Sequence, residues 1–280
     1  MKLKELRKKA IKKLADAENI SPHADVDFVL VTMLGINKTD IIIGEREMTE
    51  EEQKKLENAV ERICLGEPVQ YVVGSCEFMS LKFEVNPSVL IPRADTETLV
   101  ETVMDFCRET EKTKILEIGC GSGCVSVSLA YYLKEVKVFA IDISEKALET
   151  SVENAAALGV ADRIEFFRHD IMSGFPDIEG GVDVVVSNPP YIPQKDIDEL
   201  EKKVKAYEPR TALDGGTDGL DFYRKIASCA KLNSGGMLAF EVGFDQAEAV
   251  KKILHECGYK NIESTKDLSG IERVITGIKS

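Results

Sequence analysis

Residues Ile115-Leu-Glu-Ile-Gly-Cys-Gly-Ser-Gly123 decide the fold class of this 280-residue chain. A short apolar strand pattern runs into glycines at every second position, and a helical pattern follows. Such a turn lets the chain reverse tightly and lets a ligand touch the backbone, because glycine has no side chain. The dinucleotide fingerprint G-x-G-x-x-G does not fit, since its last glycine falls on Cys124 or Ser126, depending on which glycine starts it.

Strand and helix patterns alternate from residue 95 to the end of the chain. Apolar strand patterns lie at 113–118, 136–141, 163–168, 182–187, 236–242, 260–265 and 272–278. Helical patterns lie at 96–108, 123–133, 145–158, 218–231 and 245–256. This alternation predicts an α/β domain over 95–280, with a mainly parallel sheet covered by helices on both faces.

The first 94 residues differ from the rest. Residues 1–75 have helical periodicity, and Thr49 with Glu52 predicts a capping box, so we expect a small α-helical domain. The lysine-rich first helix is interpreted as a packed helix with a solvated face; the alternative is a membrane-surface or nucleic-acid helix. Residues 76–94 combine a short hairpin pattern with helix-breaking prolines and predict a β-hairpin connector.

Composition narrows the function classes. The formal net charge is −13, of which residues 76–280 carry −11 and residues 1–75 carry −2. An acidic larger domain is a poor binder of phosphate backbones, which argues against a nucleic-acid substrate. No apolar run approaches the ~20 residues of a transmembrane helix. Seven cysteines lack paired spacing and three histidines stand apart, so we expect a reducing cytoplasm and no metal site.

An acid two residues before a loop with alternating glycines resembles the S-adenosylmethionine methyltransferases. The resemblance implies that this loop contacts the amino-acid and ribose portions of the cofactor. The cofactor-binding candidates here are Glu117, Gly119, Cys120, Gly121, Ser122 and Gly123.

Two acids that follow later strands are further cofactor candidates. Asp142 ends the strand pattern 136–141, where a carboxylate accepts hydrogen bonds from ribose hydroxyls in open α/β folds. The alternative is a helix cap or turn residue, although Ser144 is also placed to cap the helix. Asp170, with Ile171 after it, follows the third strand pattern, where this fold class commonly contacts adenine; the alternative is a turn aspartate.

Asn188-Pro189-Pro190-Tyr191 follows the fourth strand pattern, at the edge where open α/β sheets bind ligands. Average residue usage makes this tetrapeptide improbable by chance, on the order of 10⁻⁵ per position. The side-chain oxygen of Asn188 and the carbonyl of Pro189 can accept both hydrogens of a planar NH₂ group, and Tyr191 can stack on it. The pattern therefore predicts methylation of a planar amino nitrogen and leaves amide and nucleobase open.

Taken over nearly its whole length, the chain resembles the peptide-chain release-factor glutamine methyltransferases of the HemK/PrmC type. The segments that carry the resemblance are 66–74, 77–78, 89–97, 119–123, 142, 188–191, 208–220, 241–246 and 267–273. Family membership implies a seven-stranded Rossmann-like methyltransferase domain behind a small helical domain. The implied reaction is N5-methylation of the glutamine in the Gly-Gly-Gln loop of class 1 release factors.

The same resemblance assigns further site residues and the partner. It implies a protein substrate, the release factor, with no direct nucleic-acid or membrane binding. Asn188 is then also a cofactor contact, and Arg93 and Glu97 lie near the substrate pocket. For Arg93, the alternative is a scaffolding pair with a local acid.

Two other classes remain as hypotheses. A nucleobase methyltransferase, acting on adenine N6 or guanine N2, would share Asn188–Tyr191 but would need a basic groove. A non-catalytic cofactor-binding module would need no acceptor motif, so the tetrapeptide argues against it.

Overall fold

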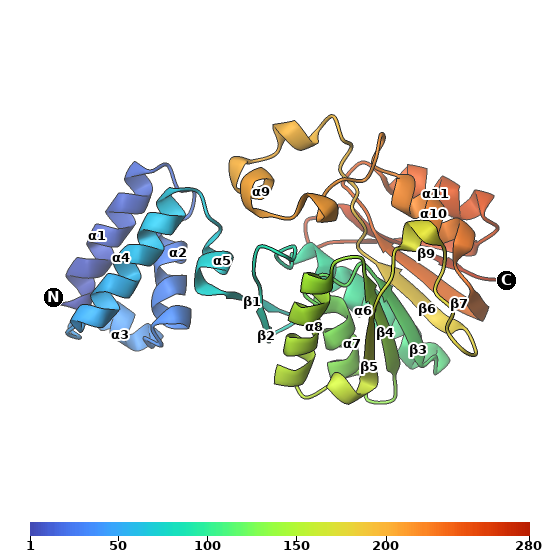
Figure 1. The fold of residues 1–280 in the computed structure, drawn as a ribbon, viewed down its shortest axis with the longest axis horizontal. Coiled ribbons are helices and arrows are strands. Elements are labelled where there is room, and N and C mark those ends of the chain that lie inside the picture. The colour runs from blue at the N-terminus through green and yellow to red at the C-terminus, as the bar shows by residue number, and fades with distance from the viewer. The chain divides into compact units, whose positions relative to one another are not determined.

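The computed structural model describes residues 1–280, apart from the side chains of Lys202 and Lys203. The chain forms two compact units (Figure 1). One comprises Met1–Ser75 and Glu201–Tyr207, and the other comprises Cys76–Leu200 and Glu208–Ser280. None of the helices in this described part of the chain combines the length and apolar character that crossing a bilayer requires.

The first unit is helical. Its elements are α1 (Leu3–Asp16), α2 (Pro22–Phe28), a π-helical turn (Val29–Met33), α3 (Lys38–Ile43), α4 (Glu50–Cys64), α5 (Val69–Val73) and α9 (Lys202–Tyr207). The apolar stripe of α1 is buried in the core of this unit, as expected for a packed helix with a solvated lysine face. The predicted capping box is confirmed, because Thr49 Oγ1 accepts from the Glu52 N–H while Glu52 accepts from the Thr49 N–H.

The second unit opens with a hairpin and continues as alternating strands and helices. The hairpin strands are β1 (Ser75–Phe78) and β2 (Leu81–Glu84), and Met79 and Ser80 between them have positive φ, as a two-residue hairpin turn requires. The larger sheet contains β3 (Lys114–Ile118), β4 (Lys137–Asp142), β5 (Ile164–Arg168), β6 (Val182–Ser187), β7 (Leu232–Glu241), β8 (Lys260–Lys266) and β9 (Glu272–Ile278). The helices are α6 (Asp95–Thr110), α7 (Cys124–Tyr132), α8 (Glu145–Ala157), α10 (Asp221–Cys229) and α11 (Ala247–Glu256).

The predicted seven-stranded α/β fold is confirmed. The strand order is β5-β4-β3-β6-β7-β9-β8, and only β9 runs antiparallel to its neighbours. The chain moves outward from β3 through β4 to β5 and then returns to place β6 on the other side of β3. The carboxyl ends of β3 and β6 therefore flank the topological switch point, where open α/β sheets bind their ligands.

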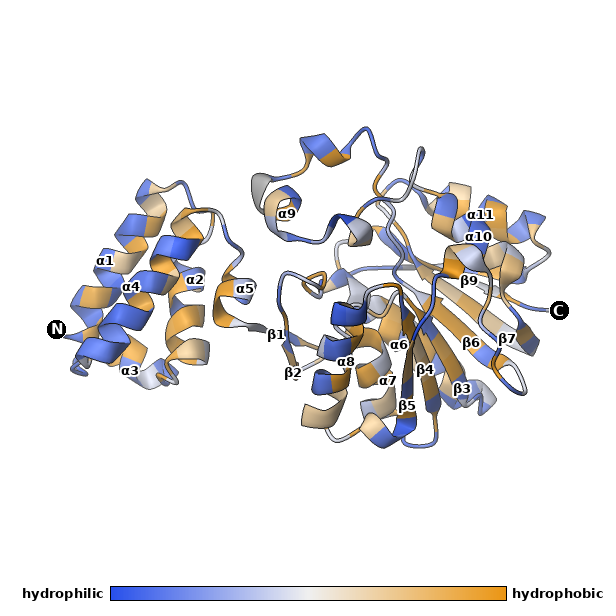
Figure 2. Ribbon diagram, in the orientation of Figure 1, coloured by the Kyte–Doolittle hydropathy of each residue, from blue (hydrophilic) through white to orange (hydrophobic). Residues whose placement is uncertain are grey.

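Alternation along the strands assigns each side chain to a layer. Leu116 and Ile118 belong to the core that α10 and α11 complete, whereas Glu117 points to the other face and accepts a hydrogen bond from Ser126 of α7. Figure 2 shows the strands of the sheet as largely hydrophobic, as expected when helices cover both faces. Figure 1 shows α6, α7 and α8 on one face of the sheet and α10 and α11 on the other.

Candidate active site

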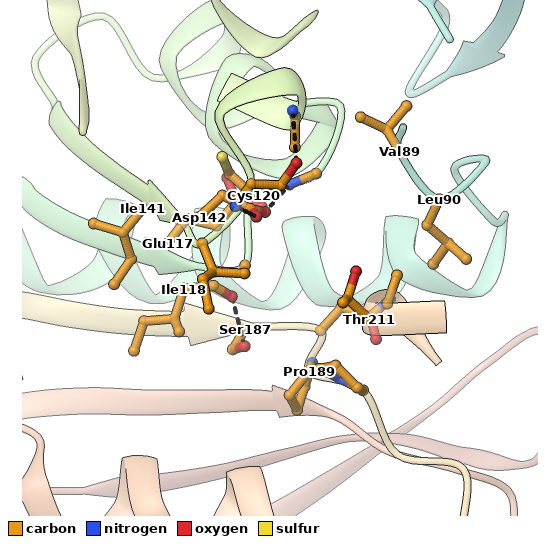
Figure 3. Close-up of a pocket in the computed structure, with 18 of the residues that line it drawn as sticks. Val89, Leu90, Glu117, Ile118, Cys120, Ile141, Asp142, Ser187, Pro189 and Thr211 are labelled. Carbon is orange, nitrogen blue, oxygen red and sulfur yellow. Dashed lines mark hydrogen bonds between the residues drawn. The ribbon is translucent and has the colours of Figure 1, made fainter. Parts of the chain in front are cut away.

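A pocket opens at the carboxyl ends of β3, β4 and β6 (Figure 3). It brings together most of the residues that the sequence singled out. These are Arg93, Glu117, Gly119, Cys120, Gly121, Ser122, Asp142, Asp170, Ile171, Asn188, Pro189 and Pro190. Among the described residues, the predicted Gly123, Tyr191 and Glu97 are not part of its lining.

The glycine-rich loop is shaped by backbone constraints. Gly119, Gly121 and Gly123 have φ of 76°, 56° and 77°, a backbone conformation that residues other than glycine rarely adopt. A Cβ on the first two would meet no atom within 4 Å, whereas a Cβ on Gly123 would lie 3.1 Å from Ser151. The first two glycines therefore leave room for a ligand, and the third lets α7 pack closely against α8.

Glu117 lies at the end of β3, beneath this loop, and is buried. Its Oε2 accepts a hydrogen bond from the Ser126 N–H at 2.9 Å. Burial raises the pKa of this carboxyl to about 8, because the ionised form loses its hydration. A bound ammonium group would offset that penalty, so the site suits a ligand that carries a positive charge.

Asp142 ends β4 and holds the loop in place. Its two oxygens accept hydrogen bonds from the Gly121 N–H at 3.0 Å and the Ser144 N–H at 2.9 Å. Burial raises the pKa of Asp142 above its usual range. Ser144 caps α8 by accepting from the Ala147 N–H, so Asp142 is not the helix cap. Its hydrogen bond from the Ser144 N–H, two residues on, does fit the alternative role as a turn residue. Each carboxylate oxygen keeps acceptor capacity for ligand hydroxyls.

Asp170 combines both of its sequence interpretations. Its carboxylate accepts from the Met172 N–H at 2.9 Å and caps the 3₁₀ turn Ile171–Ser173, as a turn aspartate does. Asp170 and the buried Ile171 also line the pocket. The adenine contact at this position stays a prediction.

Asn188 follows β6 at the pocket. Ser187, the last residue of β6, donates to the Ile118 carbonyl at 2.7 Å, which ties the ends of β6 and β3 together (Figure 3). Asn188 Nδ2 donates to Thr96 Oγ1 at 3.2 Å. The amide nitrogen is therefore engaged by α6, and the amide oxygen has no hydrogen-bond partner among the described residues, so it can accept from a ligand.

A buried glutamine holds the backbone just after Asn188. Gln246 Nε2 donates to the Tyr191 carbonyl at 2.9 Å, and its Oε1 accepts from the Gly243 N–H at 3.1 Å. Glycines leave space for this arrangement: a Cβ on Gly219 would lie 2.3 Å from the Tyr191 carbonyl oxygen. The backbone of the tetrapeptide is thus held by Gln246 and closely packed against Gly219, an arrangement that the sequence analysis did not predict.

Arg93 and Glu97 occupy different surroundings. Arg93 lines the pocket and pairs with Glu208 at 2.5 Å, so its ion pair reaches 115 residues along the chain rather than a local acid. Burial raises the pKa of Glu208, and its Oε2 has no hydrogen-bond partner among the described residues. Glu97 accepts from the Met79 N–H at 2.6 Å, which anchors the hairpin turn to α6.

Sequence reasoning missed the apolar wall of the pocket. That wall includes Val89, Leu90 and Pro92 from the segment after the hairpin, Ala212 from the 3₁₀ turn before α10 and Phe222 from the first turn of α10, with Ser88 and Thr211 beside them. Figure 3 shows Val89 and Leu90 at one side of the pocket and Thr211 beside Pro189 at another. The resemblance of segments 89–97 and 208–220 pointed toward this wall, but not to Ser88 or Phe222, which lie outside both segments.

The fold and the site together define a class of enzyme. A seven-stranded Rossmann-like sheet, a glycine-rich loop after β3, an acid after β4 and Asn-Pro-Pro-Tyr after β6 belong to an S-adenosylmethionine-dependent methyltransferase. The family described as the methyltransferase small domain matches residues 94–206, and the PrmC N-terminal domain matches residues 5–74.

Curated relatives match the whole chain. It is 36% identical over 284 residues to the release factor glutamine methyltransferase of Koribacter versatilis, covering 100% of this chain and 99% of that protein. It is 37% identical to the one of Clostridium acetobutylicum, again over 100% of this chain and 99% of that protein. The chain therefore belongs to the release factor glutamine methyltransferase family.

Solved structures of lower identity show the fold. A methyltransferase from Pyrococcus furiosus superimposes with a TM-score of 0.51 at 19% identity and covers 72% of this chain and 91% of its own. The hMettl16 catalytic domain, solved in complex with the MAT2A 3′UTR hairpin 6, gives 0.54 at 13% identity and covers 82% of each chain.

Proposed function

We propose that this protein methylates the side-chain nitrogen (N5) of the glutamine in the Gly-Gly-Gln loop of class 1 peptide-chain release factors. The observation that carries the proposal is Asn188, whose amide oxygen is left free at the pocket while its nitrogen is bound to Thr96. Full-length similarity to release factor glutamine methyltransferases supports an amide rather than a nucleobase as the acceptor.

The pocket fits S-adenosylmethionine by the chemistry of its donors. Glu117 suits the amino-acid end of the cofactor, because an ammonium there would stabilise its ionised form. Asp142 suits the ribose hydroxyls, and the open side of Gly119 and Gly121 lets the cofactor approach the backbone. When bound, S-adenosylmethionine supplies an electrophilic methyl group on a sulfonium centre.

Asn188 and Pro189 would do the chemical work by positioning. A glutamine amide nitrogen is a poor nucleophile, since its lone pair is delocalised into the carbonyl. Acceptors at Asn188 Oδ1 and the Pro189 carbonyl would hold both N–H hydrogens and direct the lone pair toward the methyl group. The same acceptors stabilise the positive charge that develops on nitrogen, and the extra proton then leaves to water.

The helical unit is proposed as the recognition part of the protein. All residues that line the pocket lie at or beyond Ser88, so residues 1–75 are free for a partner that is itself a protein. The acidic charge of residues 76–280 supports a substrate without direct nucleic-acid binding. A release factor as substrate implies the cytoplasm, and free thiols at all seven cysteines are compatible with it.

A substrate screen with labelled S-adenosylmethionine tests the proposal. The acceptors are a class 1 release factor, the same factor with Gly-Gly-Gln changed to Gly-Gly-Glu, bulk RNA and DNA. We expect label on the unaltered factor alone, because the glutamate variant lacks the amide nitrogen. Label on RNA or DNA would favour a nucleobase methyltransferase, and label on both forms of the factor would place the modification elsewhere.

A further inference from the structure

Glu241 is a buried acid behind the pocket that the chemistry described above does not use. It is the last residue of β7, its residue is 3% exposed, and the pocket lining, among the described residues, does not include it. It follows Phe240, which pairs with Ser187, so Glu241 and Asn188 come next to each other at the ends of β7 and β6. Thr96 and Asn188 both act on its carboxyl group by hydrogen bonding, Thr96 more than Asn188, and Glu241 Oε2 has no hydrogen-bond partner among the described residues.

The chemistry of a carboxylate fixes which end of the Asn188 side chain it faces. An ionised carboxylate only accepts hydrogen bonds, so the Asn188 atom beside it must be the NH₂ group. Thr96 Oγ1 accepts from the same nitrogen, which leaves the Thr96 hydroxyl hydrogen to be donated toward Glu241. Because the oxygen and nitrogen of the planar amide branch from Cγ on either side of the Cβ–Cγ bond, a nitrogen turned inward leaves the oxygen directed away from Glu241.

We propose that Glu241 is a positioning residue that, together with Thr96, holds the Asn188 amide with its nitrogen inward and its oxygen toward the pocket. The proposal rests on the proposed function, in which that oxygen accepts a hydrogen from the reacting nitrogen. Without this constraint the two orientations of an amide differ little in shape. The reversed one would present NH₂ to the NH₂ of the substrate, and methyl transfer would not follow.

The charge state of Glu241 decides whether the network can reverse. Burial raises the pKa of Glu241 to about 7, against the hydrogen bonds from Thr96 and Asn188 that lower it. The other charged or titratable groups that act on Glu241, or on which it acts, come from five places: Asp95 of α6, Cys124 of α7, Tyr191 after β6, Tyr223 of α10 and Arg273 of β9.

Arg273 does not neutralise Glu241 alone. Its guanidinium forms ion pairs with Asp95 at 3.0 Å and Asp267 at 3.1 Å. The hydrogen bond from Thr96 is the largest compensation for a charge on Glu241, followed by the charge of Arg273 and then by Asn188. Protonated Glu241 carries an O–H donor, which permits the reversed amide. Since the ionised form is present above the pKa, transfer should fall as the pH drops through about 7.

Single-turnover methyl transfer to a release factor, measured against pH, tests the proposal. We expect an acid limb near pH 7 in the wild type. Glu241→Gln keeps the shape but removes the charge, so it should lose that limb and transfer about 10–100-fold more slowly above it, as when outer groups orient a reacting ligand. Thr96→Ser should keep the limb where it is, and Thr96→Val should move it to higher pH, because the hydrogen bond from Thr96 lowers the pKa of Glu241.

The controls separate positioning from folding. Cofactor affinity should be nearly unchanged in Glu241→Gln, and its thermal unfolding should remain cooperative. Glu263→Gln removes one negative charge from an exposed position on β8 and should leave the pH profile as it is. A Glu241→Gln protein that keeps the wild-type rate and acid limb overturns the proposal, as does a uniform loss of rate with the limb retained.

A measurement without substrate distinguishes this inference from the proposed function. In ¹⁵N-labelled protein, the Asn188 side-chain NH₂ resonances should titrate with a midpoint near 7 and should stop doing so in Glu241→Gln. Resonances that titrate identically in both proteins contradict the role of Glu241 even if no release factor is methylated. Wild-type protein that methylates no release factor contradicts the proposed function alone.

Discussion

The Asp142 carboxylate is fixed before any ligand arrives, because two backbone N–H groups already donate to it. When ribose hydroxyls donate hydrogen bonds to it, binding loses little free energy to ordering of the acceptor. Glu117, by contrast, is a buried acid with one backbone donor. The two acids therefore address different ends of one ligand: hydroxyls at the first and a cation at the second.

Asp142→Ala should weaken S-adenosylmethionine binding about 10–100-fold, since lost charge-assisted hydrogen bonds cost about 1.5–3 kcal/mol. Part of that loss reflects the Gly121 N–H, which also loses its acceptor. Asp142→Asn is the matched variant, because it keeps one acceptor oxygen and should lose less. Titration calorimetry measures both, and unchanged affinity in the alanine variant would remove Asp142 from the cofactor site.

Asn188→Ala should slow methyl transfer about 10²–10³-fold with cofactor affinity largely kept, by analogy with the loss of one preorganised polar group. Asn188→Asp should also be poor, for a reason visible only in the structure: it sets a second carboxylate against Thr96 and the buried Glu241. Single-turnover assays on a release factor measure both. Near-wild-type transfer by the alanine variant would end the assignment of Asn188 as the acceptor.

Whether a side-chain contact could be predicted from the sequence depends on how far apart its two residues lie along the chain. Ser144 and Asp142 are two residues apart, and local pattern correctly offered Ser144 as the cap. Thr96 and Asn188 are 92 residues apart, and Arg93 and Glu208 are 115 apart, so no local pattern could pair them. Their contacts depend on strand order, which brings α6 and the ends of β6 and β7 together.

At the scale of elements, periodicity predicted every strand of the large sheet to within a few residues. The largest difference is β7, which starts at Leu232 rather than 236, because its pairing with β6 resumes after a register shift at Val182–Val184. Asn233, Ser234 and Gly235 hide the start of this strand from a hydrophobic pattern. Helix α10 begins later than expected, since Asp218 and Gly219 belong to the turn before it.

The close packing of Gly219 against the Tyr191 backbone leads to a prediction. Gly219→Ala should destabilise the fold more than Gly270→Ala, because both have positive φ but only the first Cβ would strike backbone, 2.3 Å from the Tyr191 oxygen. The excess should be about 1–3 kcal/mol, as for other overpacked sites. Denaturant unfolding measures the difference. Equal losses of unfolding free energy in the two variants would mean that the loop shifts to accommodate the added methyl group at Gly219.

For the whole molecule, deletion of residues 1–75 should leave cofactor affinity largely intact and abolish efficient transfer to an intact release factor. The reason is that every pocket residue lies outside the deleted segment. Transfer to a short Gly-Gly-Gln peptide should be similar with and without the helical unit, so the peptide reports whether the remaining protein is competent.

Calorimetry and circular dichroism on the shortened protein provide the control for folding. Because Glu201–Tyr207 would lose its packing partners, a second variant should also replace that segment with glycine and serine. Full-rate methylation of the intact factor by either variant would show that recognition does not depend on the helical unit.

The helical unit is built from two separate stretches of chain, since Glu201–Tyr207 packs with Met1–Ser75 and Tyr207 donates to the Leu65 carbonyl at 3.3 Å. The helical unit therefore cannot be exchanged by replacing one contiguous segment of the chain. A chimera that takes only residues 1–75 from a relative still has the original α9, which would have to pack against helices of a different sequence. Transplanting substrate choice between members of this family requires both stretches to travel together, the second grafted into the catalytic half.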